Sequence, residues 1–216
     1  MPVEFTEFDI EGPVLFVPNR HRDKRGVFAE TFRYDDFCEV VGDIDLVQEN
    51  HSISVPINTI RGLHFQTCPY AQGKLIRVTQ GAILDVAVDI RPRSATFGQH
   101  IKIELSAENW YQLWIPEGFA HGFKTLKPDT HVMYKASNYY SPDHDRGIAW
   151  NDPDLGIDWQ LYGQQPVVSE KDSRQPLLSD LNPEILGPMG HTPPNHDFTP
   201  LNLNRANVTV LSANPS

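Results

Sequence analysis

The sequence is poor in cysteine and lacks both long apolar runs and an apolar leader. It contains 2 cysteines among 216 residues, too few for a disulfide scaffold, and this usage fits a reducing compartment. No stretch reaches the roughly 18 apolar residues of a membrane-spanning helix. The opening residues MPVEFTEFDIEG have neither the basic nor the apolar region of a signal peptide. We therefore expect a cytoplasmic protein without a membrane partner.

Basic clusters are missing as well. The formal net charge is −10 and no run of Lys and Arg is suited to following a phosphate backbone, so nucleic acid is excluded as the main partner. A small anionic ligand is still compatible with this charge, because a few Arg and Lys side chains can converge in one pocket. Hydrophobic residues make up 39% of the chain, which is enough for a packed core.

Short β-type runs, broken by Gly, Pro and Asn, dominate what is present. Residues 74–91 are predicted to form two strands joined at Gln80-Gly81, and residues 33–42 are the best helix candidate. Long crossover helices are lacking, which argues against a doubly wound parallel sheet. The spacing predicts an all-β sandwich or barrel with a few short helices. The other predicted strands are residues 26–32, 100–106, 111–116 and 131–140.

The composition changes near residue 180. From there the chain is rich in Pro and Asn and shows little periodicity, as is typical of irregular segments. We therefore predict one domain over residues 1–180 and an irregular C-terminal extension over residues 181–216.

The segment RGLHFQ, residues 61–66, contains a histidine that suits three roles. The three candidate roles of His64 are metal ligand, proton-transfer base and packing residue. Phe65-Gln66 follow it, so the second histidine of a His-x-His metal pair is absent, and His121 in PEGFAHGF has no nearby His or Cys. This spacing argues against a metal site. Nucleophilic catalysis is not supported either, because no Gly-x-Ser-x-Gly motif occurs and neither cysteine adjoins a histidine.

Proton transfer accounts for more of the sequence. Removing a proton next to a ketone needs a base with a pKa near neutral, an acid that returns the proton, and a cation near the developing enolate oxygen. His64, Tyr134 and Lys74 have the right chemistry. Taken singly, each also has a structural interpretation: a packing histidine, a strand aromatic and a solvated strand end.

A series of motifs along residues 10–178 resembles one known family. They are RGVFAETF, QENHSIS, RGLHFQ, AQGKLIRV, GAILDVAVDIR, WIPEGFAHGF, YKASNYYSP, GIAWNDPDLGIDW and SEKD. In order and spacing they are similar to the dTDP-4-dehydrorhamnose 3,5-epimerase family. The resemblance implies a cupin-like jelly-roll β-barrel that forms a homodimer and uses neither a metal nor another cofactor. It implies inversion of dTDP-4-dehydro-6-deoxy-D-glucose at C3 and C5, on the route to dTDP-L-rhamnose and glycans such as lipopolysaccharide O-antigen.

The resemblance also implies four catalytic roles. His64 matches the base, and Asp172 in SEKD matches the carboxylate that orients it. Such a carboxylate fixes the imidazole tautomer and stabilises the imidazolium formed after proton abstraction. Tyr134 matches the proton donor on the opposite face of the sugar, and Lys74 matches the cation near the C4 oxygen.

Further positions match residues that bind the substrate in the family. Arg25 and Arg61 match diphosphate contacts, where a planar guanidinium suits paired oxygens. Tyr140 matches an aromatic residue that stacks on thymine. The other implied contacts with the nucleotide and sugar are Phe28, Glu30, Gln48, Asn50, His121, Asp145 and Lys171.

Two residues and one segment either differ from the family pattern or allow more than one role. Family members often have Glu where this chain has Asp145, which is expected still to accept hydrogen bonds over a shorter reach. They often have a proline pair where this chain reads TCPY at residues 67–70, next to the predicted site. Asp85 either lies near the sugar as a second carboxylate or points outward from its strand.

Three other functions remain as alternatives. One is a related epimerase that inverts a single carbon of another dTDP-keto-sugar. Another is a metal-dependent jelly-roll oxygenase. The third is a non-catalytic sugar-binding module, which explains the aromatic residues and arginines but not a set of His, Asp, Tyr and Lys.

Overall fold

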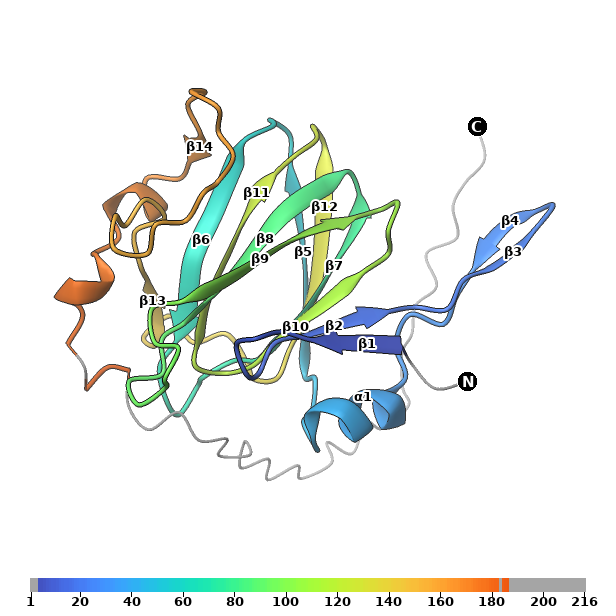
Figure 1. Ribbon diagram of the computed structural model, residues 1–216, viewed down its shortest axis with the longest axis horizontal. Coiled ribbons are helices and arrows are strands. Elements are labelled where there is room, and N and C mark those ends of the chain that lie inside the picture. The colour runs from blue at the N-terminus through green and yellow to red at the C-terminus, as the bar shows by residue number, and fades with distance from the viewer. Residues whose placement is uncertain (1–3, 183, 187–216) are drawn as a thin grey trace, which may run out of the picture.

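The chain folds into two β-sheets that lie face to face (Figure 1). The structure, a computed structural model, describes residues 4–182 and 184–186. The first sheet has the order β1-β2-β10-β7-β12-β5: Glu4–Glu7, Val14–Val17, Gln112–Ile115, Lys74–Gln80, Thr130–Ala136 and Gln48–Ser54. The second has the order β13-β6-β11-β8-β9: Asp145–Gly147, Thr59–Gln66, Phe119–Thr125, Ala82–Asp89 and His100–Ser106. It also has β14 (Val167–Val168) beside β6. Because successive strands from β5 onward mostly alternate between the sheets, the predicted cupin-like jelly roll is confirmed.

Strand β8 is buried over its whole length. Alternate side chains face opposite sides of a sheet, and both sides of β8 are covered. Ile83 and Ala87 belong to the core between the two sheets, whereas Val86 and Val88 pack on the outer side with Trp159. This two-sided burial explains why β8 reads as an almost continuous apolar run.

The outer side of the second sheet is covered by the C-terminal part of the described chain. This part contains the 3-10 helices η1 (Asp172–Arg174) and η2 (Leu178–Asp180). Leu181, Ile185 and Leu186 also pack there, so the first described residues of the predicted C-terminal extension contact the barrel. Residues 183 and 187–216 of that extension lie outside the described residues.

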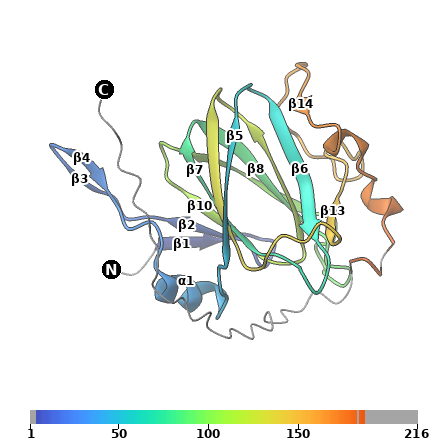
Figure 2. The same cartoon turned by 180° about the vertical axis from the view of Figure 1, so that it is seen from behind.

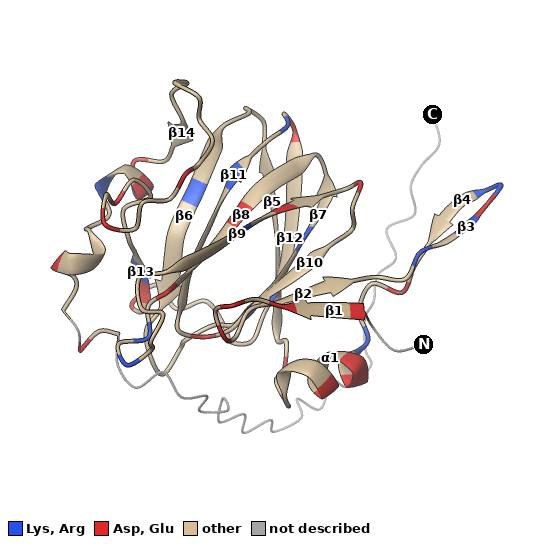
Figure 3. Cartoon of the chain, in the orientation of Figure 1, with Lys and Arg blue, Asp and Glu red and all other residues tan. Residues whose placement is uncertain are grey.

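Two segments near the N-terminus lie beside the barrel. The predicted helix is confirmed as α1 (Tyr34–Val41), where Phe37 packs edge-on against Trp114 with 5.1 Å between ring centroids. Asp35 and Asp36 lie in its first turn, which suits the positive end of the helix dipole, and Figure 3 shows this acidic face. Strands β3 (His21–Asp23) and β4 (Gly26–Phe28) form a separate hairpin.

Strand predictions are correct where polar and apolar residues alternate regularly. They are wrong where side chains, instead of a neighbouring strand, are the hydrogen-bond partners of the segment. Residues 74–91 form β7 and β8, and residues 100–106 form β9, as predicted. The predicted strand over residues 26–32 is wrong beyond Phe28. Thr31 is held there by side chains instead, because Arg77 donates to its hydroxyl at 3.2 Å and Gln112 donates to its carbonyl. The predicted strand over residues 131–140 likewise ends at Ala136.

Candidate active site

One pocket of about 1170 Å³, open to solvent, brings the four predicted catalytic residues together. His64 comes from β6, Lys74 from β7, Tyr134 from β12 and Asp172 from η1. Strands β6 and β12 belong to different sheets, so His64 and Tyr134 reach the pocket from opposing walls of the barrel. Arg61, His121 and Lys171, which were predicted to bind substrate, also line this pocket.

His64 and Asp172 form a tight pair. The His64 Nε2 atom lies 2.6 Å from Asp172 Oδ1, and the Asp172 side chain is only 5% exposed. Burial alone raises the pKa of Asp172. The hydrogen bond and charge of His64, with the backbone N–H of Gly62, outweigh this effect and hold the pKa below its usual value. The ionised carboxylate therefore keeps the proton on Nε2 and leaves the lone pair on Nδ1.

Gly62 lets β6 and β11 approach closely beneath this pair. Its φ is +126°, and a Cβ atom there would lie 2.5 Å from the Cα of Gly122. His64 lies opposite His121 in the pairing of the two strands, and their register shifts between His121 and Phe123, next to Gly122. The position of His64 therefore depends on a glycine two residues earlier in the same strand.

A Gly62→Ala variant should lose more stability than backbone strain alone explains. Gly26 is the control with a similar backbone angle, because its φ is +137° but no atom within the single chain would lie within 4 Å of a Cβ there. Gly26→Ala should cost about 1–3 kcal/mol, and Gly62→Ala should cost clearly more because the strand backbones must separate. Urea unfolding of both variants measures the difference. Equal losses would show that the close approach of β6 and β11 contributes nothing.

A second His–Asp pair lies beside the first. His121 Nε2 is 3.0 Å from Asp85 Oδ1, and the Asp85 side chain is fully buried. The interpretation of Asp85 as an outward-pointing strand residue is therefore wrong. It shares a face of β8 with Ile83 and Ala87, which face the inter-sheet core.

Lys74 is a cation in a poorly solvated position. Burial lowers the pKa of its ammonium to about 8, while the charges of Asp145 and Asp85 oppose this shift. Its Nζ lies 3.5 Å from the backbone oxygen of His64. Lys74 is therefore charged at neutral pH and loses its proton under mildly alkaline conditions.

Tyr134 keeps its proton at neutral pH and under the mildly alkaline conditions in which Lys74 loses its own. Burial raises the pKa of its phenol, the charge of Arg61 opposes this increase, and the charges on Asp145 and Tyr140 add smaller increases. Its Cα lies opposite that of Asn50 in the pairing of β12 with β5. This places one of the predicted binding residues beside the predicted proton donor.

At one end of β6, Asp145 joins Tyr140 to Lys171. The Tyr140 hydroxyl donates to Asp145 at 3.0 Å, and the Lys171 ammonium lies 2.5 Å from the same carboxylate oxygen. The shorter Asp side chain thus accepts hydrogen bonds, as expected. The bond to Asp145 also raises the pKa of Tyr140, so this phenol stays protonated.

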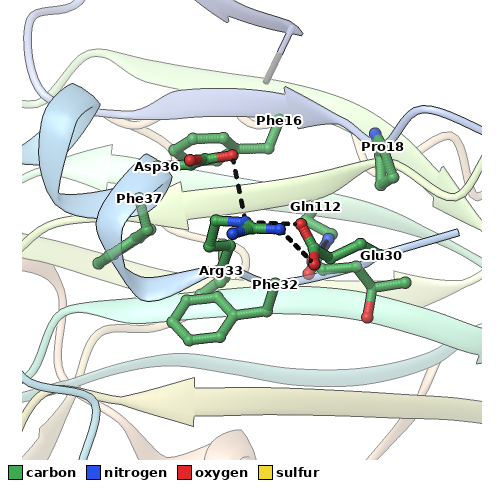
Figure 4. A pocket seen from close by; sticks show the side chains of 10 residues that line it. Phe16, Pro18, Glu30, Phe32, Arg33, Asp36, Phe37 and Gln112 are labelled. Atoms are coloured by element: carbon green, nitrogen blue, oxygen red, sulfur yellow. Dashed lines mark hydrogen bonds and ion pairs between the residues drawn. The ribbon is translucent and has the colours of Figure 1, made fainter. Parts of the chain in front are cut away.

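Seven predicted binding residues do not line this pocket, and three of them, Arg25, Phe28 and Glu30, line two other pockets. The other four are Gln48, Asn50, Tyr140 and Asp145. Arg25 and Phe28 are on the β3–β4 hairpin, which projects from the side of the barrel opposite β6 (Figures 1 and 2). Glu30 binds Arg33 through both carboxylate oxygens, at 2.8 and 2.9 Å. Figure 4 shows this pair, with Asp36 on the other side of Arg33, in a separate pocket of about 410 Å³. The structure therefore does not bring these three residues to His64 within one chain.

Two serines in the pocket were missed from the sequence. Ser169 accepts a hydrogen bond from the backbone of Asp172 at 3.0 Å. Its signal was the spacing of Ser and Asp in VVSEKD, typical of side-chain-capped turns. Ser52 also lines the pocket, and among the described residues its oxygen is a buried side-chain atom without a hydrogen-bond partner. No local pattern distinguishes Ser52 from other strand serines.

Two kinds of feature are absent from residues 4–182 and 184–186. These residues contain no group of three or more His, Cys, Asp or Glu side chains arranged to hold a metal ion. None of their helices is long and apolar enough to cross a membrane.

Comparison with known proteins gives one consistent result. The sequence model of the family described as dTDP-4-dehydrorhamnose 3,5-epimerase matches residues 7–180. A protein of that name from Sinorhizobium fredii (strain NBRC 101917 / NGR234) is 51% identical over 177 residues, which cover 82% of this chain and 90% of the relative.

Solved structures agree in fold. The dTDP-6-deoxy-D-glucose-3,5-epimerase of Legionella pneumophila Philadelphia 1, in complex with dTDP-4-keto-L-rhamnose, superimposes with a TM-score of 0.82. It is 40% identical, and the match covers 88% of this chain and 99% of that chain. A 3'-monoepimerase from Streptomyces bikiniensis in complex with dTDP-quinovose has a TM-score of 0.75 at 33% identity, covering 80% of this chain and 86% of that chain.

Proposed function

Because this chain belongs to the dTDP-4-dehydrorhamnose 3,5-epimerase family, we propose that its pocket inverts C3 and C5 of dTDP-4-dehydro-6-deoxy-D-glucose to give dTDP-4-dehydro-L-rhamnose. The observation that carries this proposal is the meeting of His64, Asp172, Lys74 and Tyr134 around one cavity. A base, a cation and an acid around one cavity are what inversion next to a ketone requires.

Each inversion is a proton removal followed by a proton return. His64 Nδ1 takes the proton from C3, and the electron pair of that bond moves into an enolate whose negative oxygen lies at C4. Lys74 stabilises this oxygen, and Asp172 stabilises the imidazolium. Tyr134 then gives its proton to the opposite face of the carbon. His64 then releases its proton to solvent and Tyr134 regains one from solvent, so that the same steps can follow at C5.

Deuterium exchange in D₂O tests this reaction directly. Proton NMR of dTDP-4-dehydro-6-deoxy-D-glucose with the enzyme should show deuterium entering at both C3 and C5. A reductase should trap a product of L-lyxo configuration. Exchange at one carbon only would restrict the enzyme to a single inversion. No exchange in folded protein that binds dTDP would refute the proposed reaction.

Epimerase activity should fall as pH rises through about 8. The pKa of Lys74 is lowered to about 8, so the ammonium that stabilises the enolate is present below this pH and lost above it. The pH profile of kcat/KM reports groups of the uncomplexed enzyme and should show this alkaline limb. Lys74→Arg keeps its charge at all these pH values, so its residual activity should not fall between pH ~8 and ~10. An unchanged alkaline limb in Lys74→Arg would assign the limb to another group.

We further propose a homodimer in which the hairpin of one subunit contributes to the pocket of its partner. Phe28 is 72% exposed, and the only charged partner that Arg25 has among the described residues is Asp23 of the same hairpin. Both residues match binding positions of the family, yet both lie away from their own pocket. A second copy of the chain reconciles these two facts.

Mixing two inactive variants tests the shared site. If Arg25 acts in the partner's pocket, Arg25→Ala and His64→Ala subunits should restore activity when they form mixed dimers. Random exchange gives half mixed dimers, each with one intact pocket, hence about a quarter of the wild-type activity per subunit. Failure to recover activity after demonstrated subunit exchange would place Arg25 in its own pocket or outside the reaction.

We propose a cytoplasmic location and a role in supplying rhamnose for surface glycans such as lipopolysaccharide O-antigen. The chain has only 2 cysteines, Cys38 and Cys68, which fits a reducing compartment. The role in glycan synthesis follows from the proposed product.

A further inference from the structure

The segment from Asn138 to Ser141 carries Tyr140 beyond the end of β12 and belongs to no sheet. Backbone N–H and C=O groups that leave a sheet need other hydrogen-bond partners. The Tyr140 residue is 56% exposed, so little packing surrounds its ring. What fixes this segment therefore determines where the Tyr140 ring lies.

Side-chain amides supply most of these partners. Gln72 donates to the carbonyl of Asn138 at 2.7 Å, and the N–H of Tyr140 donates to Gln48 Oε1 at 2.9 Å. Gln66 holds the positions on both sides of Tyr140. Its Nε2 donates to the carbonyl of Tyr139 at 3.1 Å, and its Oε1 accepts from the N–H of Ser141 at 2.7 Å.

Gln66 also connects this segment to the catalytic strand. It is the last residue of β6, two positions after His64, and it is only 5% exposed. Its Nε2 donates a further bond, to the carbonyl of Tyr70 at 2.6 Å. Its Cα lies opposite that of Asp145, the residue that accepts the Tyr140 hydroxyl. The backbone and the hydroxyl of Tyr140 are thus both anchored at the same end of β6.

We propose that Gln66 is a positioning residue that fixes the Tyr140 ring for the nucleotide base. The inference rests on the proposed function and on the role that the family resemblance implies for Tyr140, stacking on thymine. A ring held in place before binding loses less conformational freedom on binding, which strengthens the complex. Removing the Gln66 amide leaves the ring present but releases the backbone on both sides of it.

The test compares two probes, dTDP and inorganic pyrophosphate. Gln66→Met is close in size and removes all three backbone contacts. We expect its affinity for dTDP to fall by about tenfold or more, the scale of a lost stacking contact, and its affinity for pyrophosphate to change less than about twofold. KM for the nucleotide sugar should rise much more than kcat falls. Gln80→Leu is the control, because Gln80 also donates to a backbone carbonyl, that of Asp129, away from the pocket.

A double-mutant cycle with Tyr140→Ala decides how Gln66 acts. If Gln66 acts through Tyr140, the double variant should bind dTDP no more weakly than Tyr140→Ala alone. Additive losses, or an equal loss of pyrophosphate affinity, would mean general disruption and overturn the inference. So would a normal dTDP affinity in Gln66→Met when Tyr140→Ala binds weakly. Normal dTDP affinity in Tyr140→Ala would overturn both the stacking role and this inference, while deuterium exchange in the same protein would still test the reaction.

If Gln66→Met does not fold, Gln66→Glu is the substitute variant. It keeps the oxygen that accepts from the N–H of Ser141 and removes the amide N–H groups that donate to Tyr139 and Tyr70.

Discussion

A His64→Ala variant should lose epimerase turnover by about 10²–10⁴-fold, the usual cost of deleting a positioned base, while keeping its affinity for dTDP. The His64 imidazole is paired through Nε2 with the ionised carboxylate of Asp172 and retains a lone pair on Nδ1. Product formation followed by NMR and dTDP binding followed by calorimetry measure the two quantities separately.

Two further variants sharpen this prediction. Asp172→Asn places an amide against Nε2, which favours the tautomer with the proton on Nδ1 and removes the base without removing the ring. It should therefore lose nearly as much activity as His64→Ala. His100→Ala is the control, because His100 lies on β9 outside the pocket. Near-normal turnover in His64→Ala would show that another group is the base.

The fold was predictable where neighbouring residues alone determine it. Residues 100–106 alternate clearly and form β9, and residues 33–42 contain α1. β6 was not delimited, and β11 was missed, because each has a glycine in its middle and several buried polar residues. Gly62 and Gly122 serve contact between the two strands, which is a property of the pair and not of either segment.

The sequence predicted which residues form the site but not how these residues pair in space. His64 and Asp172 are 108 residues apart, and His121 and Asp85 are 36 apart. No periodicity links such distant positions, so the resemblance to a family supplied the pairing of His64 with Asp172. The hairpin that carries Arg25 and Phe28 shows a second limit of prediction from sequence. Sequence reasoning assigned these residues to a pocket that a single chain does not let them reach.

A Tyr134→Phe variant should lose net inversion by about 10²–10⁴-fold but still exchange substrate protons with solvent. His64 and Asp172 are untouched, so deprotonation continues. Without the phenol, the proton returns from His64 to the face it left. The phenyl ring keeps the packing of Tyr134 against the inter-sheet core, so stability should change little. NMR in D₂O should therefore show deuterium entering the unchanged substrate.

This outcome distinguishes the role of His64 on one wall of the pocket from the role of Tyr134 on the opposing wall. His64→Ala should stop both deuterium entry and inversion, whereas Tyr134→Phe should stop inversion alone. The difference follows from the position of β6 and β12 in opposing sheets, because each residue then reaches only one face of a sugar bound between them. If Tyr134→Phe inverts at a normal rate, water or another side chain delivers the proton, and Tyr134 is only part of the pocket wall. If it stops deuterium entry as well, the phenol is needed for deprotonation, and the assignment of acid and base to opposing sheets is wrong.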